Sequence, residues 1–177
     1  MLKLSFVEAN VNSDPLIVAN PSHMMIVMKA YQQQKSHERR GAAALYYVGG
    51  YDQSLMNVSS VHVYRPATGW VGAMPMPDSR SYAVAAVVHG KLYVAGGFAD
   101  DDVRTNSMLL YNPMTRVWRY TSPMKSRRNS AVAGVVGGKL YVAGGNDEDE
   151  GTISRMEAYD PLTQIWEDAP PMSTARE

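Results

Sequence analysis

The sequence predicts an all-β chain folded as part of a β-propeller, and two observations carry this prediction. Residues 80–118 recur at 128–166 without an insertion, so that Arg80, Gly96 and Trp118 each have an identical counterpart 48 residues later. Each copy also carries a glycine pair directly after the same Lys-Leu-Tyr-Val-Ala run. A repeat of about 50 residues marked by paired glycines, a tyrosine and a tryptophan is typical of propeller blades.

Each complete repeat is expected to contain four strands. Residues 82–88 form a continuous apolar run rich in β-branched side chains, which predicts a strand buried on both faces beside the propeller axis. A tight turn at His89-Gly90 leads to the second strand at 91–95. The third strand is predicted at 107–111, and the outermost strand begins at 117–119 after a turn initiated by proline.

Glycine, tryptophan and arginine recur at fixed places in the repeat and are given structural roles. The glycine pair at 96–97 is expected to let the backbone pass close to its neighbours, where a Cβ atom would clash. Trp70, Trp118 and Trp166 are expected to fill the gaps between adjacent blades. Arg80 and its counterpart are expected to hold carbonyl groups between blades.

Two further copies are partial. Residues 44–50 and 64–70 supply a strand, a glycine pair, a tyrosine and a tryptophan, but no apolar innermost strand precedes them. Pro171-Met172 and Arg176 match the start of the other repeats. The sequence therefore predicts a first blade that is short by one strand, and a chain divided as follows: blade 1 at about 41–77, blade 2 at about 78–124, blade 3 at about 125–172, and the start of a fourth repeat at 173–177.

These markers resemble the kelch repeat, and the first forty residues resemble the C-terminal end of a BACK domain. Asn20-Pro21 is a helix start, and Leu4–Val11 is compatible with another helix. Residues 1–40 are therefore expected to be the end of a BACK-like helical domain with a linker, and 41–177 the kelch repeats. The motifs that match BACK are Phe6-Val7-Glu8, Asp14-Pro15-Leu16-Ile17, Asn20-Pro21, Met28-Lys29-Ala30-Tyr31 and Glu38-Arg39-Arg40.

The resemblance has consequences for the ends of the chain. Kelch propellers of the BTB, BACK and kelch family commonly close when a strand from the C-terminus completes the first blade. The resemblance thus implies that the missing strand lies beyond Glu177. It further implies a fragment of a longer protein, from which a BTB domain, most of BACK and roughly three blades are absent.

The composition of the chain and its lack of catalytic motifs argue against several kinds of function. The 177 residues carry 17 Lys and Arg against 17 Asp and Glu, which argues against a nucleic-acid or membrane surface. The sequence has no cysteine, and no long apolar run or signal peptide is evident, so a cytoplasmic location is expected. The four histidines occupy unrelated repeat positions. We therefore expect no enzyme activity, no metal and no cofactor.

The loops after the glycine pairs, at 51–59, 98–106 and 146–155, are where the copies differ most. Two of them are acidic, with Asp100-Asp101-Asp102 and Asp147-Glu148-Asp149-Glu150. Three interpretations are open. The acids form a solvated turn, they select a basic peptide, or they bind calcium, although the glycine and glutamate spacing of a calcium loop is missing.

The resemblance also implies where a target protein or peptide would bind, namely directly after the glycine pair and just after the repeat arginine. Tyr51, Tyr82 and Phe98 have the aromatic character of interface anchors. The variable loops contain only Arg104 and Arg155 as arginines, which argues against an acidic ligand. The complete predicted set is Tyr51, Gln53, Ser81, Tyr82, Phe98, Asp100, Asn129, Ser130, Asn146 and Glu148.

Two functions follow from the resemblance. The first is substrate recognition in an adaptor of a cullin-RING ubiquitin ligase, where a BTB domain absent from this chain would bind the cullin and the propeller would present the target for ubiquitination. This role rests on the BACK-like residues and not on the blades. The alternative is a kelch scaffold without a ligase, for example an actin- or cytoskeleton-associated protein.

Overall fold

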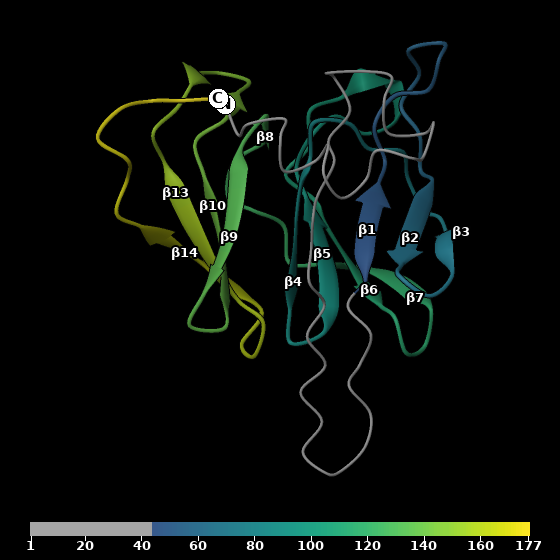
Figure 1. Cartoon of the computed structure of the whole chain (residues 1–177). Coiled ribbons are helices and arrows are strands. Elements are labelled where there is room, and N and C mark those ends of the chain that lie inside the picture. The colour runs from purple at the N-terminus through teal and green to yellow at the C-terminus, as the bar shows by residue number, and fades with distance from the viewer. Residues whose placement is uncertain (1–43) are drawn as a thin grey trace.

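The computed structural model describes residues 44–177, and these form three antiparallel blade sheets that stand side by side in chain order, together with one small sheet built from loops (Figure 1). This arrangement confirms the prediction of an all-β, partial propeller. The BACK-like segment 1–40 and its two expected helices lie outside the described residues.

Blade 1 is a three-stranded sheet with the order β1-β2-β3. Its strands are β1 (Leu45–Val48), β2 (Val61–Arg65) and β3 (Gly69–Gly72). Because β1 corresponds to the second strand of the later repeats, the sheet has no innermost strand among residues 44–177.

Blades 2 and 3 are complete four-stranded sheets with the orders β4-β5-β6-β7 and β9-β10-β13-β14. The second strand of blade 2 has the bounds expected from the sequence, and the third begins one residue later than expected, at Met108. The strands of blade 2 are β4 (Val84–Val88), β5 (Lys91–Ala95), β6 (Met108–Asn112) and β7 (Val117–Thr121). Those of blade 3 are β9 (Val132–Val136), β10 (Lys139–Ala143), β13 (Met156–Asp160) and β14 (Ile165–Ala169).

The glycine pairs lie where the backbones of adjacent segments nearly touch. A Cβ atom on Gly49 would lie 2.2 Å from the Arg80 carbonyl oxygen, and one on Gly97 would lie 2.3 Å from that of Ser81. No side chain fits at such distances, which confirms the role predicted for the pair. The N–H of Gly97 also donates to the carbonyl of Arg128 at 2.8 Å, and this hydrogen bond joins blade 2 to the start of blade 3.

Tyrosines form the contact between neighbouring blades. Tyr46 of blade 1 meets Tyr111 of blade 2 with ring centroids 6.4 Å apart, and Tyr93 of blade 2 meets Tyr159 of blade 3 at 5.7 Å. All four rings are buried and belong to one hydrophobic core that runs through the three blades. Edge-on and tilted aromatic pairs of this kind add to the stabilisation that burial alone provides.

The tryptophans connect each blade to the segment that enters it. The indole Nε1–H groups of Trp118 and Trp166 donate to the carbonyls of Met74 and Ser122, each at 2.9 Å. Both acceptors precede the repeat arginine, at the passage from one blade to the next, so the inter-blade role predicted for these two tryptophans is confirmed. Trp70 makes its ring contact within its own blade, against Tyr64 at 5.4 Å.

The repeat arginines differ from expectation in one respect. The guanidinium groups of Arg80 and Arg128 donate to the carbonyls of Gly96 and Gly144, which belong to the same blade as the arginine. The link to the preceding blade is instead made by the carbonyl groups of the arginines, since that of Arg80 accepts the N–H of Gly50 at 2.6 Å. The prediction that the side chains hold carbonyls between blades is therefore wrong.

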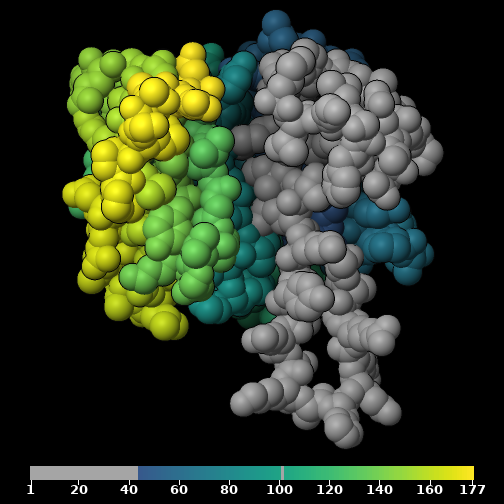
Figure 2. Space-filling model, turned by 60° about the vertical axis from the view of Figure 1, so that its left-hand side comes forward, coloured from purple at the N-terminus to yellow at the C-terminus, as the bar shows by residue number. Residues whose placement is uncertain are grey.

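The innermost strands of blades 2 and 3 differ sharply in burial. Val88 of β4 is 2% exposed, whereas Val132 and Val136 of β9 are 64% and 67% exposed. In Figure 2 the surface of the third blade, coloured green to yellow, is open to the viewer. The prediction of a buried innermost strand, made for residues 82–88, is therefore confirmed for β4. The apolar residues of β9 follow a similar pattern but are mostly exposed among residues 44–177, so burial depends on the neighbouring segment as well as on the strand.

Candidate protein-binding rim

The loops that follow the glycine pairs and those that follow the repeat arginines lie at the same end of the blades. A short β-bridge between Ser81 and Phe98 joins the two kinds of loop, and a second bridge pairs Phe98 with Arg104 within the loop 98–106. The equivalent loops of blade 3 form a small sheet of β8 (Arg128–Asn129), β11 (Asn146–Asp147) and β12 (Gly151–Thr152), seen at the top of Figure 1. We call this surface, residues 51–57, 79–82, 98–106, 128–130 and 146–152, the rim.

Three aromatic side chains form a row across the rim. Tyr51 of blade 1 contacts Tyr82 at a centroid distance of 5.8 Å, and Tyr82 contacts Phe98 at 6.0 Å, both in edge-to-face geometry. All three rings are partly exposed. The row therefore offers apolar surface to a partner while its members hold one another in place.

The backbone at Tyr82 has a conformation that the sequence did not indicate. Its φ is +50°, and its repeat counterpart Ser130 has a φ of +54°. Residues other than glycine and asparagine rarely adopt this left-handed region. The N–H of Ser130 donates to the carbonyl of Tyr82 at 3.0 Å, so the two strained positions support each other across the blades. Neither tyrosine nor serine marks such a position in a sequence.

Arg104 extends the aromatic row towards blade 3. Its guanidinium carbon lies 5.6 Å from the centre of the Phe98 ring, which is cation–π geometry. Its Nε donates to Asn129 Oδ1 at 2.8 Å, and its Nη2 donates to Asn146 Oδ1 at 3.1 Å. Within residues 44–177 no carboxylate pairs with Arg104. The predicted set omitted this arginine, although its place in a variable loop was a usable signal.

The acidic loop of blade 2 is fastened to neighbouring segments. Asp100 Oδ1 accepts hydrogen bonds from the hydroxyl and the backbone N–H of Ser79 at 2.6 and 2.9 Å, and these two bonds hold the pKa of Asp100 below its usual value. Asp102 Oδ1 accepts from the side-chain amide of Asn57 in blade 1 at 2.7 Å. Both carboxylates thus position the loop that carries Phe98, in addition to any contact with a partner.

Two of the four acids in the 147–150 loop of blade 3 are matched by arginines. Glu148 lies 3.4 Å from Arg127, and Glu150 forms an ion pair with Arg155. All four side chains are well exposed, so each pair contributes little stability. Because Glu148 and Glu150 are paired with arginines, the loop offers a basic peptide less net attraction than its four consecutive acids suggest.

The predicted residues thus occupy different places on the rim and beneath it. Tyr51, Tyr82 and Phe98 are in contact, and Asn129 and Asn146 meet through Arg104. Ser81 and Asn129 are only 1% and 9% exposed, so they support the rim from below. Gln53 and Glu148 are exposed, and Glu148 lies beside Arg127.

Residues 44–177 lack two kinds of feature. No group of three His, Cys, Asp or Glu side chains is arranged to hold a metal ion. No helix in this part of the chain has the length and apolar character needed to cross a membrane.

Repeated four-stranded sheets, a glycine pair at each close approach and a loop-built rim define a repeat protein of the β-propeller class. The sequence model of the kelch motif matches residues 79–125 and 127–173. The chain therefore belongs to the kelch-repeat family.

Sequence similarity to known proteins supports this assignment. The chain is 32% identical over 106 residues to mouse Kelch-like protein 35, covering 57% of this chain and 18% of that protein. It is also 32% identical over 132 residues to zebrafish Kelch-like protein 21, covering 64% of this chain and 20% of that protein. The chain thus spans about a fifth of the length of these relatives.

A solved structure, titled "Structure of YjhT", has a TM-score of 0.61 at 18% identity, over 85% of this chain and 54% of that chain. At this level of identity the likeness concerns the fold.

Proposed function

We propose that the chain binds a partner protein through the rim. The observation that carries the proposal is the aromatic row Tyr51–Tyr82–Phe98, which Arg104 continues by cation–π contact. Tyrosine and arginine are among the residues that contribute most to binding energy at protein interfaces. Here they stand on loops that a rigid set of sheets holds in place, an arrangement suited to recognition.

The chemistry of the rim favours a peptide or loop with an apolar anchor. The rings offer apolar area, and Arg104 is held by two neutral amide oxygens, so its charge is left for a polar group of the partner. Asp100, Asp102 and Glu148 are already engaged by serine, asparagine and arginine side chains. We therefore propose that the aromatic row provides most of the affinity and that the acids act mainly through the position of their loop.

Replacement of Tyr82 by alanine is expected to weaken the partner complex by about 2 kcal/mol, or roughly thirty-fold, because the middle ring of the row is lost. The partner is obtained by affinity capture with the parent chain from cell extract, and its affinity is measured by biolayer interferometry. Tyr141→Ala is the matched control, since this tyrosine is partly exposed and lies in the middle of β10, outside the rim. A Tyr82→Ala chain that retains parental affinity would place the binding surface elsewhere.

We further propose that the longer gene product is a substrate-recognition adaptor of a cullin-RING ubiquitin ligase and that it works in the cytoplasm. Two observations support this role: the similarity to Kelch-like proteins 35 and 21, and the BACK-like motifs of residues 1–40. In such an adaptor the rim would hold the target while another domain binds the cullin.

The ligase role predicts a difference between two forms of the protein. A tagged endogenous gene product is expected to co-precipitate a cullin, whereas residues 1–177 expressed alone are expected to recover none. The measurement is immunoblotting for cullins after capture of equal amounts of each form. Cullin recovery by the 177-residue chain would overturn the assignment of roles, and absence of a cullin from both captures would favour a scaffold without a ligase.

A further inference from the structure

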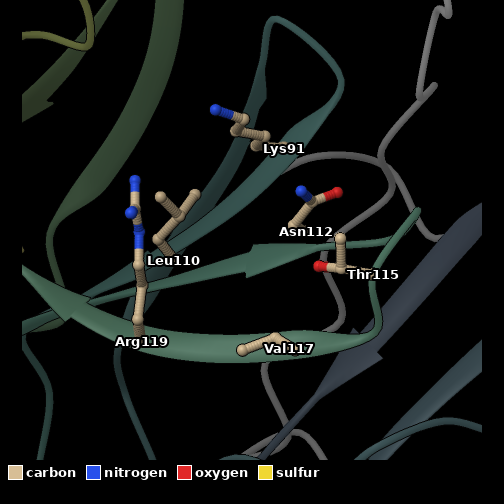
Figure 3. A pocket seen from close by; sticks show the side chains of 6 residues that line it. All are labelled: Lys91, Leu110, Asn112, Thr115, Val117 and Arg119. Atoms are coloured by element: carbon tan, nitrogen blue, oxygen red, sulfur yellow. The ribbon is translucent and has the colours of Figure 1, made fainter.

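A second site is present at the end of blade 2 opposite the rim. A cavity of about 320 Å³ opens there, and the side chains that line it come from β5, β6, β7 and the turn between β6 and β7 (Figure 3). Lys91 is the first residue of β5 and Asn112 the last of β6, which places the cavity at the end of the strands remote from the glycine pairs. The lining residues are Lys91, Leu110, Asn112, Thr115, Val117 and Arg119.

The cavity carries two positive charges that nothing in the described chain neutralises. Among residues 44–177 neither Lys91 nor Arg119 has an ion pair with a carboxylate. The phenol of Tyr93 is electrostatically coupled to Arg119, but burial raises the pKa of this tyrosine to about 12, so its hydroxyl stays neutral at physiological pH. Two unmatched cations in a concave site favour an anion.

Blade 3 provides an internal comparison because its residues stand at the same repeat positions, 48 residues later. There Lys139, the counterpart of Lys91, lies 3.4 Å from Asp160 and 3.8 Å from Glu167. In blade 2 these two acids are replaced by Asn112 and Arg119. The net charge of the three side chains is therefore one negative charge in blade 3 and two positive charges in blade 2.

The blade fold does not require an unmatched positive charge at this lysine. In blade 3 the lysine is matched by carboxylates of its own sheet, so the fold can neutralise this position internally. Blade 2 has the same strands and the same lysine, and it lacks both acids. The unmatched charge is thus a property of blade 2 and not a consequence of the blade architecture.

We propose that the cavity binds a small organic anion that carries a doubly charged oxyanion, and that a phosphate monoester is the class that fits it. An arginine guanidinium presents paired N–H donors that match phosphate oxygens, and the lysine ammonium adds a point charge. The Asn112 amide and the Thr115 hydroxyl supply neutral donors, while Leu110 and Val117 offer apolar surface to the organic part. The volume lies at the lower end of the range for small-molecule sites. This inference does not depend on the function proposed for the rim.

Isothermal titration of the 177-residue chain with phenyl phosphate is the test. The expected result is saturable binding at one site per chain, weakened at least about tenfold in Arg119→Gln and in Lys91→Met, since each removes a charge-assisted contact. The double variant Asn112→Asp with Arg119→Glu gives blade 2 the acids of blade 3, and it is expected to abolish binding.

Lys125→Gln is the matched control, because it removes one exposed positive charge that lies outside the cavity and pairs with Asp168. Its affinity for phenyl phosphate is expected to equal that of the parent. Far-UV circular dichroism establishes that each variant is folded, and the exposed or half-exposed positions of Arg119 and Lys91 make this the expected result.

Two further probes define the ligand class. Inorganic phosphate is expected to bind the parent more weakly than phenyl phosphate, because it lacks the part that contacts Leu110 and Val117, and phenol is expected not to bind. Absence of phenyl phosphate binding at millimolar concentration would overturn the proposal. So would binding that survives the double variant, and equal affinity for inorganic phosphate would overturn the monoester assignment.

Discussion

Truncation of Trp166 to alanine is expected to lower the free energy of unfolding by about 3–5 kcal/mol. The indole is 7% exposed, packs on Tyr159 at a centroid distance of 5.1 Å, and donates its N–H to the carbonyl of Ser122 at 2.9 Å. Its removal opens a cavity beside the inter-blade core and leaves that carbonyl without its partner. Urea unfolding followed by circular dichroism measures the loss.

Two related variants separate the contributions of packing and hydrogen bonding. Trp166→Phe keeps an aromatic ring without the N–H and is expected to lose less stability than the alanine variant. Trp70→Ala removes a half-buried indole whose ring contact lies within blade 1, so its effect should also be smaller. An equal loss for Trp70 and Trp166 would contradict the inter-blade explanation.

The periodicity of the sequence was sufficient to predict the strands of the blades, but not the small sheet of β8, β11 and β12. The arginine, glycine pair and tryptophan that mark the repeat occupy identical places in the two full copies, and a propeller places equivalent residues in equivalent surroundings. The strand expected at 91–95 has those bounds in the structure, and the glycine pairs lie at the close approaches expected of them. The β9 strand departs from this rule because burial depends on the neighbouring segment as well as on the strand.

The side-chain pairings could not be predicted in the same way. Arg104 meets Asn129 and Asn146 because loops of two different blades converge on the rim, and a repeat pattern contains no information about that convergence. The left-handed backbone at Tyr82 has no signal in its residue type. The partner of a charged residue likewise differs between repeats, because the residues around it differ from one repeat to the other.

The buried arginines show how such a pairing shifts between repeats. Arg80 is paired with Asp78, two residues earlier in the chain, at 2.7 Å. Arg128 is paired with Glu157, on strand β13, at 2.5 Å. The counterparts of these acids 48 residues away are Ser126 and Leu109. The carboxylate that pairs with the arginine therefore lies in the entering loop in blade 2 and on a strand of the sheet in blade 3. Both arginines are about 1% exposed.

Glu157→Leu, which introduces the blade 2 residue, is expected to destabilise the chain by about 3–5 kcal/mol, because it leaves a buried guanidinium without a counter-charge. The carboxylate also accepts hydrogen bonds from the backbone N–H of Lys125 and the hydroxyl of Ser126, and both lose their acceptor. Burial already lowers the pKa of Arg128, and Glu157 opposes that effect. The remaining charge would thus stay in an unfavourable environment, as urea unfolding should show.

Adding Ser126→Asp to Glu157→Leu is expected to recover most of the lost stability, because the pair of substitutions gives Arg128 the neighbour that Arg80 already has in Asp78. Ser126→Asp alone places a second carboxylate beside Glu157 and is expected to be destabilising. A double-mutant cycle measured by urea unfolding should therefore give a coupling energy of at least about 2 kcal/mol between the two positions. Additive effects would contradict this account, since they would mean that Arg128 gains its stability from the carbonyls of Gly144 and Arg155 and needs no nearby negative charge.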